Sequence, residues 1–62
     1  MPELTIWMEL KRTYGKDAYK HMKYRYISDN GKGQWKTPMN NLEIDMFLDP
    51  PEIEWEPVWT LN

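Results

Sequence analysis

The sequence predicts a small α+β domain with a three-stranded antiparallel meander, one short helix and a C-terminal extended edge strand or arm. Three observations predict this class. Apolar and polar residues alternate through much of the first half, a helix-capping motif stands near residue 40, and alternating residues containing a proline close the chain. With 62 residues, the chain has room for a single domain, residues 1–62.

The first predicted strand covers residues 4–10, where every second residue is apolar. The residues that share this apolar side are Leu4, Ile6, Met8 and Leu10. Trp7 then falls on the outer face, which makes it a candidate contact residue. Residues 14–17 follow as a predicted tight turn, in which Gly15 supplies a positive φ angle.

A second strand is predicted over residues 18–28, with a short helix beginning at Asp17 as the alternative for its first few residues. Asn30-Gly31 is the dipeptide favoured in a type I′ hairpin turn, and Gly33 is a candidate bulge position. The returning third strand places alternate residues on one face and ends near Pro38, which donates no ladder hydrogen bond. Those alternate residues are Trp35, Thr37 and Met39.

A helix is predicted from about residue 41 to residue 48. Asn40 and Glu43 have the spacing of a capping box, and Met39 and Ile44 stand at the positions of a hydrophobic staple. The prolines at 50–51 end it. A strand is the alternative, because Leu42, Ile44, Met46 and Leu48 also alternate. Beyond the prolines, alternation over residues 52–59 predicts an edge strand or docked arm, since Pro57 excludes a central strand.

The aliphatic content is low for an independently stable domain. Leu, Ile, Val and Phe together supply eleven residues, while four tryptophans, four tyrosines and five methionines supply much of the remaining apolar area. A domain of this size buries only about 60% of its unfolded surface. We therefore expect a homodimer or a subunit complexed with a larger protein.

Charge is segregated along the chain. All eight basic residues lie between positions 11 and 36, whereas residues 37–62 carry six acids and no base. One interpretation is that the acidic segment lies across the basic hairpins of its own chain or of a second protomer. Tryptophans and carboxylates alternate in that acidic segment, which favours docking into a basic groove on another protein.

The function expected from these features is protein binding. The sequence suggests a small non-enzymatic accessory or inhibitor protein, of a kind common among bacteriophage accessory genes, that docks on a larger protein. The candidate anchors are Trp7, Trp55 and Trp59, with Glu52, Glu54 and Glu56 as rim charges. The competing interpretation is that these tryptophans fill the core while the glutamates face water.

Single-stranded nucleic acid is the alternative partner. Aromatic side chains interleaved with cations are typical of surfaces that stack bases and follow phosphates. The residues concerned are Lys20, Lys23, Arg25, Tyr24, Tyr26 and Trp35. Against this alternative, the sequence pI of about 5.2 is low for a dedicated nucleic-acid binder.

Catalytic, metal and cofactor chemistry is not expected. The chain has no cysteine, which excludes disulfides, thiolate zinc ligands and thiol catalysis and suits a cytoplasmic location. His21 and Ser28, the only residues of their types, lie seven positions apart on one predicted strand, about 23 Å from each other. No metal-binding or phosphate-binding motif occurs, and no apolar run is long enough to cross a membrane.

Overall fold

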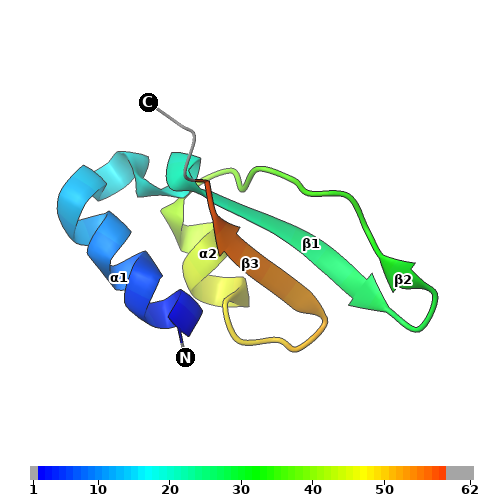
Figure 1. Cartoon of the computed structure of the whole chain (residues 1–62). Coiled ribbons are helices and arrows are strands. Elements are labelled where there is room, and N and C mark those ends of the chain that lie inside the picture. The colour runs from blue at the N-terminus through cyan, green and yellow to red at the C-terminus, as the bar shows by residue number, and fades with distance from the viewer. Residues whose placement is uncertain (1, 59–62) are drawn as a thin grey trace.

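A three-stranded antiparallel sheet and three helical segments make up residues 2–58, the part of the chain that the computed structural model describes. In chain order the elements are α1 (Pro2–Tyr14), the 3₁₀ helix η1 (Gly15–His21), β1 (Met22–Ser28), β2 (Gly31–Lys32), α2 (Asn41–Phe47) and β3 (Ile53–Pro57) (Figure 1). The strand order is β2-β1-β3. The predicted α+β class is confirmed, and the C-terminal segment is the third strand.

The strand predicted over residues 4–10 is wrong, because this segment lies within α1. Ile6, Trp7 and Leu10 turn inward together, and this spacing of three and four is the period of a helix. Pro2 occupies the first helical position, where its missing N–H costs nothing. Acidic and basic residues at opposite ends also complement the helix dipole. Leu4 is consequently 42% exposed, instead of facing a core.

The 3₁₀ helix η1 replaces the beginning of the predicted second strand, so the helical alternative from Asp17 was the better one. Gly15 has a φ angle of 58°, as predicted for the turn that ends α1. The rings of Tyr14 and His21 stack at 3.8 Å between centroids and thereby join the start and the end of η1. The strand β1 begins only at Met22, which is buried.

The hairpin between β1 and β2 turns one residue earlier than predicted. Ser28 pairs with Gly31, so Asp29 and Asn30 form the two-residue loop. A type I′ turn is wrong, since no described residue other than glycine has a positive φ angle. Tyr24 pairs with Lys36.

That pairing confirms a bulge after β2. Ile27 lies opposite Lys32, whereas Tyr24, three residues earlier, lies opposite Lys36, four residues later. The returning segment therefore contains one extra residue between Gly33, whose N–H still donates to the Tyr26 carbonyl, and Lys36. The strand predicted over residues 35–39 is reduced to the single bridge at Lys36.

The helix α2 begins as the capping motif predicted. The Asn40 side chain accepts a hydrogen bond from the Glu43 backbone N–H at 2.9 Å. The helix ends before Pro50, as expected. The staple prediction is wrong, because Met39 is 76% exposed while Ile44 is fully buried.

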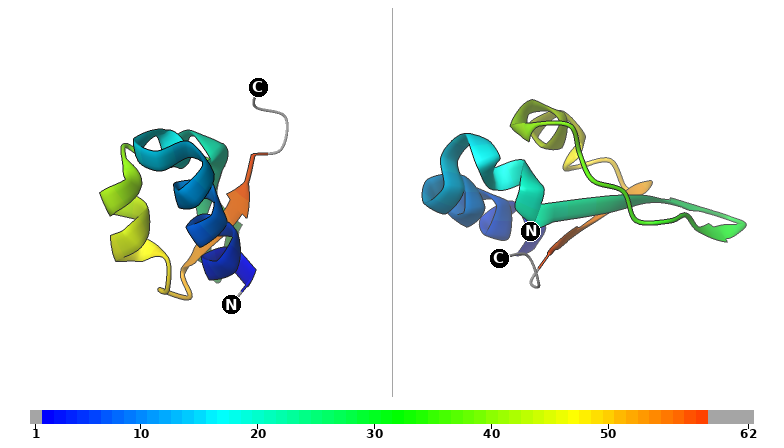
Figure 2. Two further views of the ribbon diagram at one scale, coloured as in Figure 1. Left: turned by 90° about the vertical axis from the view of Figure 1, so that its left-hand side faces the viewer. Right: turned by 90° about the horizontal axis from the view of Figure 1, so that it is seen from above.

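The core lies between the sheet, α2 and α1. The helix α2 covers one face of the sheet, and α1 lies beside the edge strand β3 (Figure 2). The buried apolar side chains are Trp7, Ala18, Met22, Ile44, Leu48 and Trp55. Both buried indoles have hydrogen-bond partners: Trp7 Nε1 donates to Asp45 Oδ1 at 2.7 Å, and Trp55 Nε1 donates to the Phe47 carbonyl at 2.8 Å.

Asn41 ties η1 to α2, and its replacement by alanine is expected to cost about 1–3 kcal/mol of folding free energy. Its Oδ1 accepts from the Tyr19 backbone N–H, and its Nδ2 donates to the Gly15 carbonyl, both at 2.9 Å. Urea denaturation followed by circular dichroism measures the loss. Asn41→Asp retains the acceptor for the Tyr19 N–H but places a carboxylate oxygen against the Gly15 carbonyl, so it should also destabilise the fold. An Asn41→Ala variant as stable as the wild type would contradict this role.

Candidate functional site

The predicted tryptophan anchors lie inside the protein. Trp7 is 0% exposed and Trp55 is 3% exposed, so neither indole has surface left to offer a partner. This arrangement matches the competing interpretation, in which the tryptophans fill the core. Trp59 lies outside the described residues. Any docking surface on residues 2–58 therefore depends on other side chains.

An exposed apolar surface lies on α2 and the residue just before its cap. We call it the α2 surface, and it consists of Met39 (76% exposed), Leu42 (64%), Met46 (63%) and Phe47 (43%). Leu42 and Met46 are one helical turn apart and share a face, directed away from buried Ile44. Because a solvated helix normally carries polar residues on its outer face, this pattern needs an explanation.

The charged groups around the α2 surface are acidic. Glu43 and Asp45 lie on the helix itself, and Asp49 follows it. Asp45 is partly neutralised by Lys11, whose Nζ lies 3.2 Å from Asp45 Oδ1. Burial, and then the negative charge of Glu43, raises the pKa of the Tyr24 phenol above its ordinary value. The rim of this surface is therefore negative.

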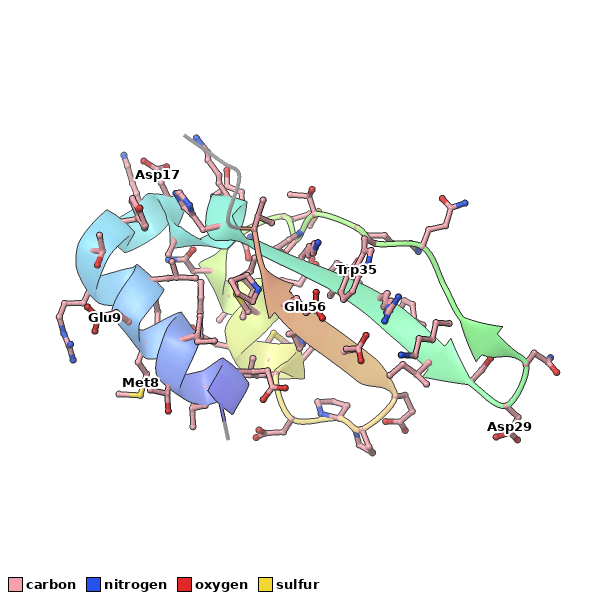
Figure 3. The ribbon with its side chains drawn as sticks, viewed as in Figure 1. Met8, Glu9, Asp17, Asp29, Trp35 and Glu56 are labelled. Atoms are coloured by element: carbon pink, nitrogen blue, oxygen red, sulfur yellow. The ribbon has the colours of Figure 1, made fainter. Side chains whose placement is uncertain are left out.

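A second surface is the face of the sheet opposite α2, which we call the open sheet face. Alternation along the strands places Lys23 and Arg25 of β1 on this face, together with Glu54 and Glu56 of β3. Lys32 of β2 joins them through its pairing with Ile27. Figure 3 shows Trp35 beside β1 and Glu56 on β3.

Contacts on the open sheet face centre on Arg25. Its Nε donates to Glu54 Oε1 at 2.5 Å, and its guanidinium carbon lies 4.2 Å from the centre of the Trp35 ring. Lys23 Nζ lies 4.9 Å from the same ring, and Lys32 Nζ lies 3.9 Å from Glu54 Oε2. Lys23 and Arg25 of β1 are thus stacked on one indole, while Glu54 of β3 partly neutralises Arg25 and Lys32.

The residues predicted for nucleic-acid binding are divided between two faces. Lys23, Arg25 and Trp35 gather on the open sheet face. Tyr24 and Tyr26 point to the opposite face, where the Tyr24 ring lies 5.0 Å from that of Trp55. Lys20 belongs to η1 and pairs with Asp17 at 3.7 Å. No single surface of the described chain therefore combines all six.

The acidic rim residues predicted in the C-terminal segment have different surroundings. Glu52 and Glu56 are exposed, whereas Glu54 is half-buried against Arg25. The acidic segment thus pairs with the basic strand of its own chain, as one interpretation of the charge segregation predicted.

The structure offers a small hollow but, among its described residues, no cluster of metal ligands. A hollow of about 170 Å³ lies beside β3, where Leu48, Pro50 and Ile53 line part of it. Ligand pockets are usually about 300–1,000 Å³. Within residues 2–58, no three acidic or histidine side chains converge as ligands for a metal ion. No helix in the described ranges has the length and apolar character needed to span a bilayer.

Comparisons of the chain with protein-family models, with curated proteins and with solved structures give no match.

The α2 surface was missed at the sequence level although its signal was present. A helix over residues 41–48 that buries Ile44 and Leu48 directs Leu42 and Met46 outward. The alternation of these four apolar residues is also the pattern of a strand, which obscures their arrangement on a helix. The available signal is that these apolar residues occupy two opposite faces of the predicted helix, of which only one can pack against the sheet.

Proposed function

We propose that this chain is a small non-enzymatic accessory or inhibitor protein that docks on a larger protein through the α2 surface. The observation that supports this proposal is the exposure of four apolar side chains, 43–76% each. Three of them lie on the short helix α2, and the fourth, Met39, lies just before its cap. Methionine makes up half of this set, and its flexible thioether adapts to irregular partner surfaces. Leu42 and Met46 are the central anchors.

The charge around this surface specifies the partner. Glu43 and Asp49 flank the apolar residues, and residues 37–58 contain no basic side chain. A complementary partner therefore presents an apolar groove bordered by Lys and Arg. A second copy of this chain is disfavoured here, because a two-fold interface would bring the two acidic rims together.

We do not propose nucleic acid as the partner. Of the three aromatic residues predicted to stack bases, only Trp35 lies on the same face of the sheet as Lys23 and Arg25. Tyr24 and Tyr26 lie on the opposite face, and Glu54 already neutralises Arg25. The acidic rim of the α2 surface would repel phosphates.

The test is a binding titration with two synthetic amphipathic helices as probes. One carries a leucine face flanked by lysines, and the other carries the same face flanked by glutamates. We expect the lysine-flanked peptide to bind the wild type, with affinity that falls as salt is added, and the glutamate-flanked peptide to bind at least about tenfold more weakly.

Two methionine variants locate the binding surface. Met46→Glu should weaken binding of the lysine-flanked peptide by about tenfold or more, because it places a charge at the centre of the apolar set. Met8→Glu is the matched control: Met8 is 52% exposed on α1, outside the α2 surface, so binding should persist. Equal binding by both variants, or no preference between the peptides, would overturn the proposal.

A further inference from the structure

The open sheet face carries two strips of opposite charge in matched register. Along β1 the outward residues are Lys23 and Arg25, and along β3 they are Glu56 and Glu54. Lys23 is the cross-strand partner of Glu56, and Arg25 is the partner of Glu54. Each positive group therefore has a negative group at the same height on the neighbouring strand.

We propose that the open sheet face is a self-association surface, on which a second copy of this chain packs face to face. The two-fold axis lies between the two packed sheets, parallel to the strands and above the line midway between β1 and β3. Rotation about this axis exchanges the two strips, so that Lys23 faces Glu56 of the partner subunit and Arg25 faces Glu54 of the partner subunit. Isologous interfaces require this kind of self-complementary surface.

The charges that would form new pairs are available. Among the described residues, Arg25 and Lys32 already pair with Glu54, whereas no ion pair within the chain involves Lys23 or Glu56. Lys23 is held over the Trp35 ring, 4.9 Å from its centre, which fixes the position of its charge. The Lys23–Glu56 contact between copies, formed twice by symmetry, is thus the main electrostatic gain.

The apolar component of this interface is small. Trp35 and Ile27 are half-buried on the face and would lose their remaining exposure between the two sheets. A strand of seven residues is only about 23 Å long, so the buried area is below that of a permanent dimer. The expected species is a transient dimer whose population rises with protein concentration and falls with added salt.

This surface is separate from the α2 surface, because the two lie on opposite sides of the sheet. The inference therefore does not depend on the proposed docking function. Phosphate-containing partners fit the open sheet face less well, since Glu54 and Glu56 line half of it.

Charge exchange between Lys23 and Glu56 tests the proposal by sedimentation equilibrium from micromolar to millimolar concentration. Lys23→Glu alone and Glu56→Lys alone each create two repulsive contacts across the axis, and each should weaken self-association by about tenfold or more. An equimolar mixture of the two variants should form a heterodimer with both contacts attractive. The double variant should self-associate like the wild type.

Controls separate folding from association. The double variant preserves the opposite charges within the chain and loses only the contact of Lys23 with the Trp35 ring, so its melting temperature should lie within about 8 °C of that of the wild type. Met46→Glu should leave self-association unchanged, which distinguishes this surface from the α2 surface. If the single variants fail to fold, the wild type still gives the answer: its Trp35 indole N–H resonance should shift with protein concentration.

A wild type that remains monomeric at millimolar concentration, with an unchanged Trp35 resonance, would overturn the proposal. So would single variants that associate as strongly as the wild type. A labelled single-stranded oligonucleotide provides the last comparison: binding that requires Lys23 in a monomeric wild type would assign the face to nucleic acid and overturn self-association.

Discussion

Replacement of Trp7 by alanine is expected to leave much of the protein unfolded at 25 °C. The Trp7 side chain is fully buried among the core residues, and its Nε1 donates to Asp45 Oδ1 at 2.7 Å. Large-to-small substitutions of buried tryptophan cost about 3–5 kcal/mol. Domains of this length have a total folding free energy of roughly 3–9 kcal/mol, so the loss consumes most of it.

Urea denaturation monitored by far-ultraviolet circular dichroism measures this effect. Trp7→Phe retains an aromatic ring but loses the Nε1 donor, and it should be less destabilised than Trp7→Ala. Met8→Ala is the neighbouring control on the exposed side of α1, and it should stay within about 0.5 kcal/mol of the wild type. A stably folded Trp7→Ala variant would show that the indole is not a core element.

Trp55→Ala is the second substitution with a large expected cost, again about 3–5 kcal/mol. Trp55 joins the two layers of the fold. Its ring packs against Tyr24 of the sheet, with centroids 5.0 Å apart, and its Nε1 donates to the Phe47 carbonyl at the end of α2. Truncation removes both contacts and leaves a cavity between β3 and α2.

The same denaturation experiment compares Trp55→Ala with Trp35→Ala, whose half-exposed indole lies on the open sheet face. Trp35→Ala should cost less than Trp55→Ala. If Trp55→Ala stayed fully folded and instead lost binding of the lysine-flanked peptide, the indole would act as a partner anchor. That result would favour the docking mode expected from the sequence over the core role seen in the structure.

Local signals predicted the bounds of α2 and the edge position of β3. The Asn40 cap and the prolines after residue 49 bracket α2 because capping and proline geometry act within a few residues. The edge position of β3 follows from Pro57, whose nitrogen has no hydrogen to donate. In each case the determining interaction is encoded in neighbouring residues.

The first element was not predictable by alternation alone. Residues 4–10 satisfy a period of two, yet Ile6 and Leu10 also satisfy a helical spacing of four. The choice depends on Trp7, which a strand places outside and a helix places in the core beside α2. The partner that decides this, Asp45, lies 38 residues away in sequence.

For the candidate surfaces, too, the sequence shows the local features but not the long-range arrangement. The acidic and basic segments were evident from composition, but their pairing register was not. Lys23 and Glu56 face each other because β3 pairs with β1, which is a long-range event. The exposure of Met46 likewise depends on which side of α2 meets the sheet, and no local pattern fixes that choice.

The central position of β1 has a consequence for biosynthesis. Its two neighbours come from different times in translation: β2 follows after a two-residue loop, whereas β3 is made after α2. Until β3 leaves the ribosome, the nascent chain has Trp7 and Met22 without Trp55 to cover them. Folding therefore waits for a late segment of the polypeptide, and non-local contacts of this kind slow it further. In that interval the uncovered apolar side chains are a target for chaperones and proteases.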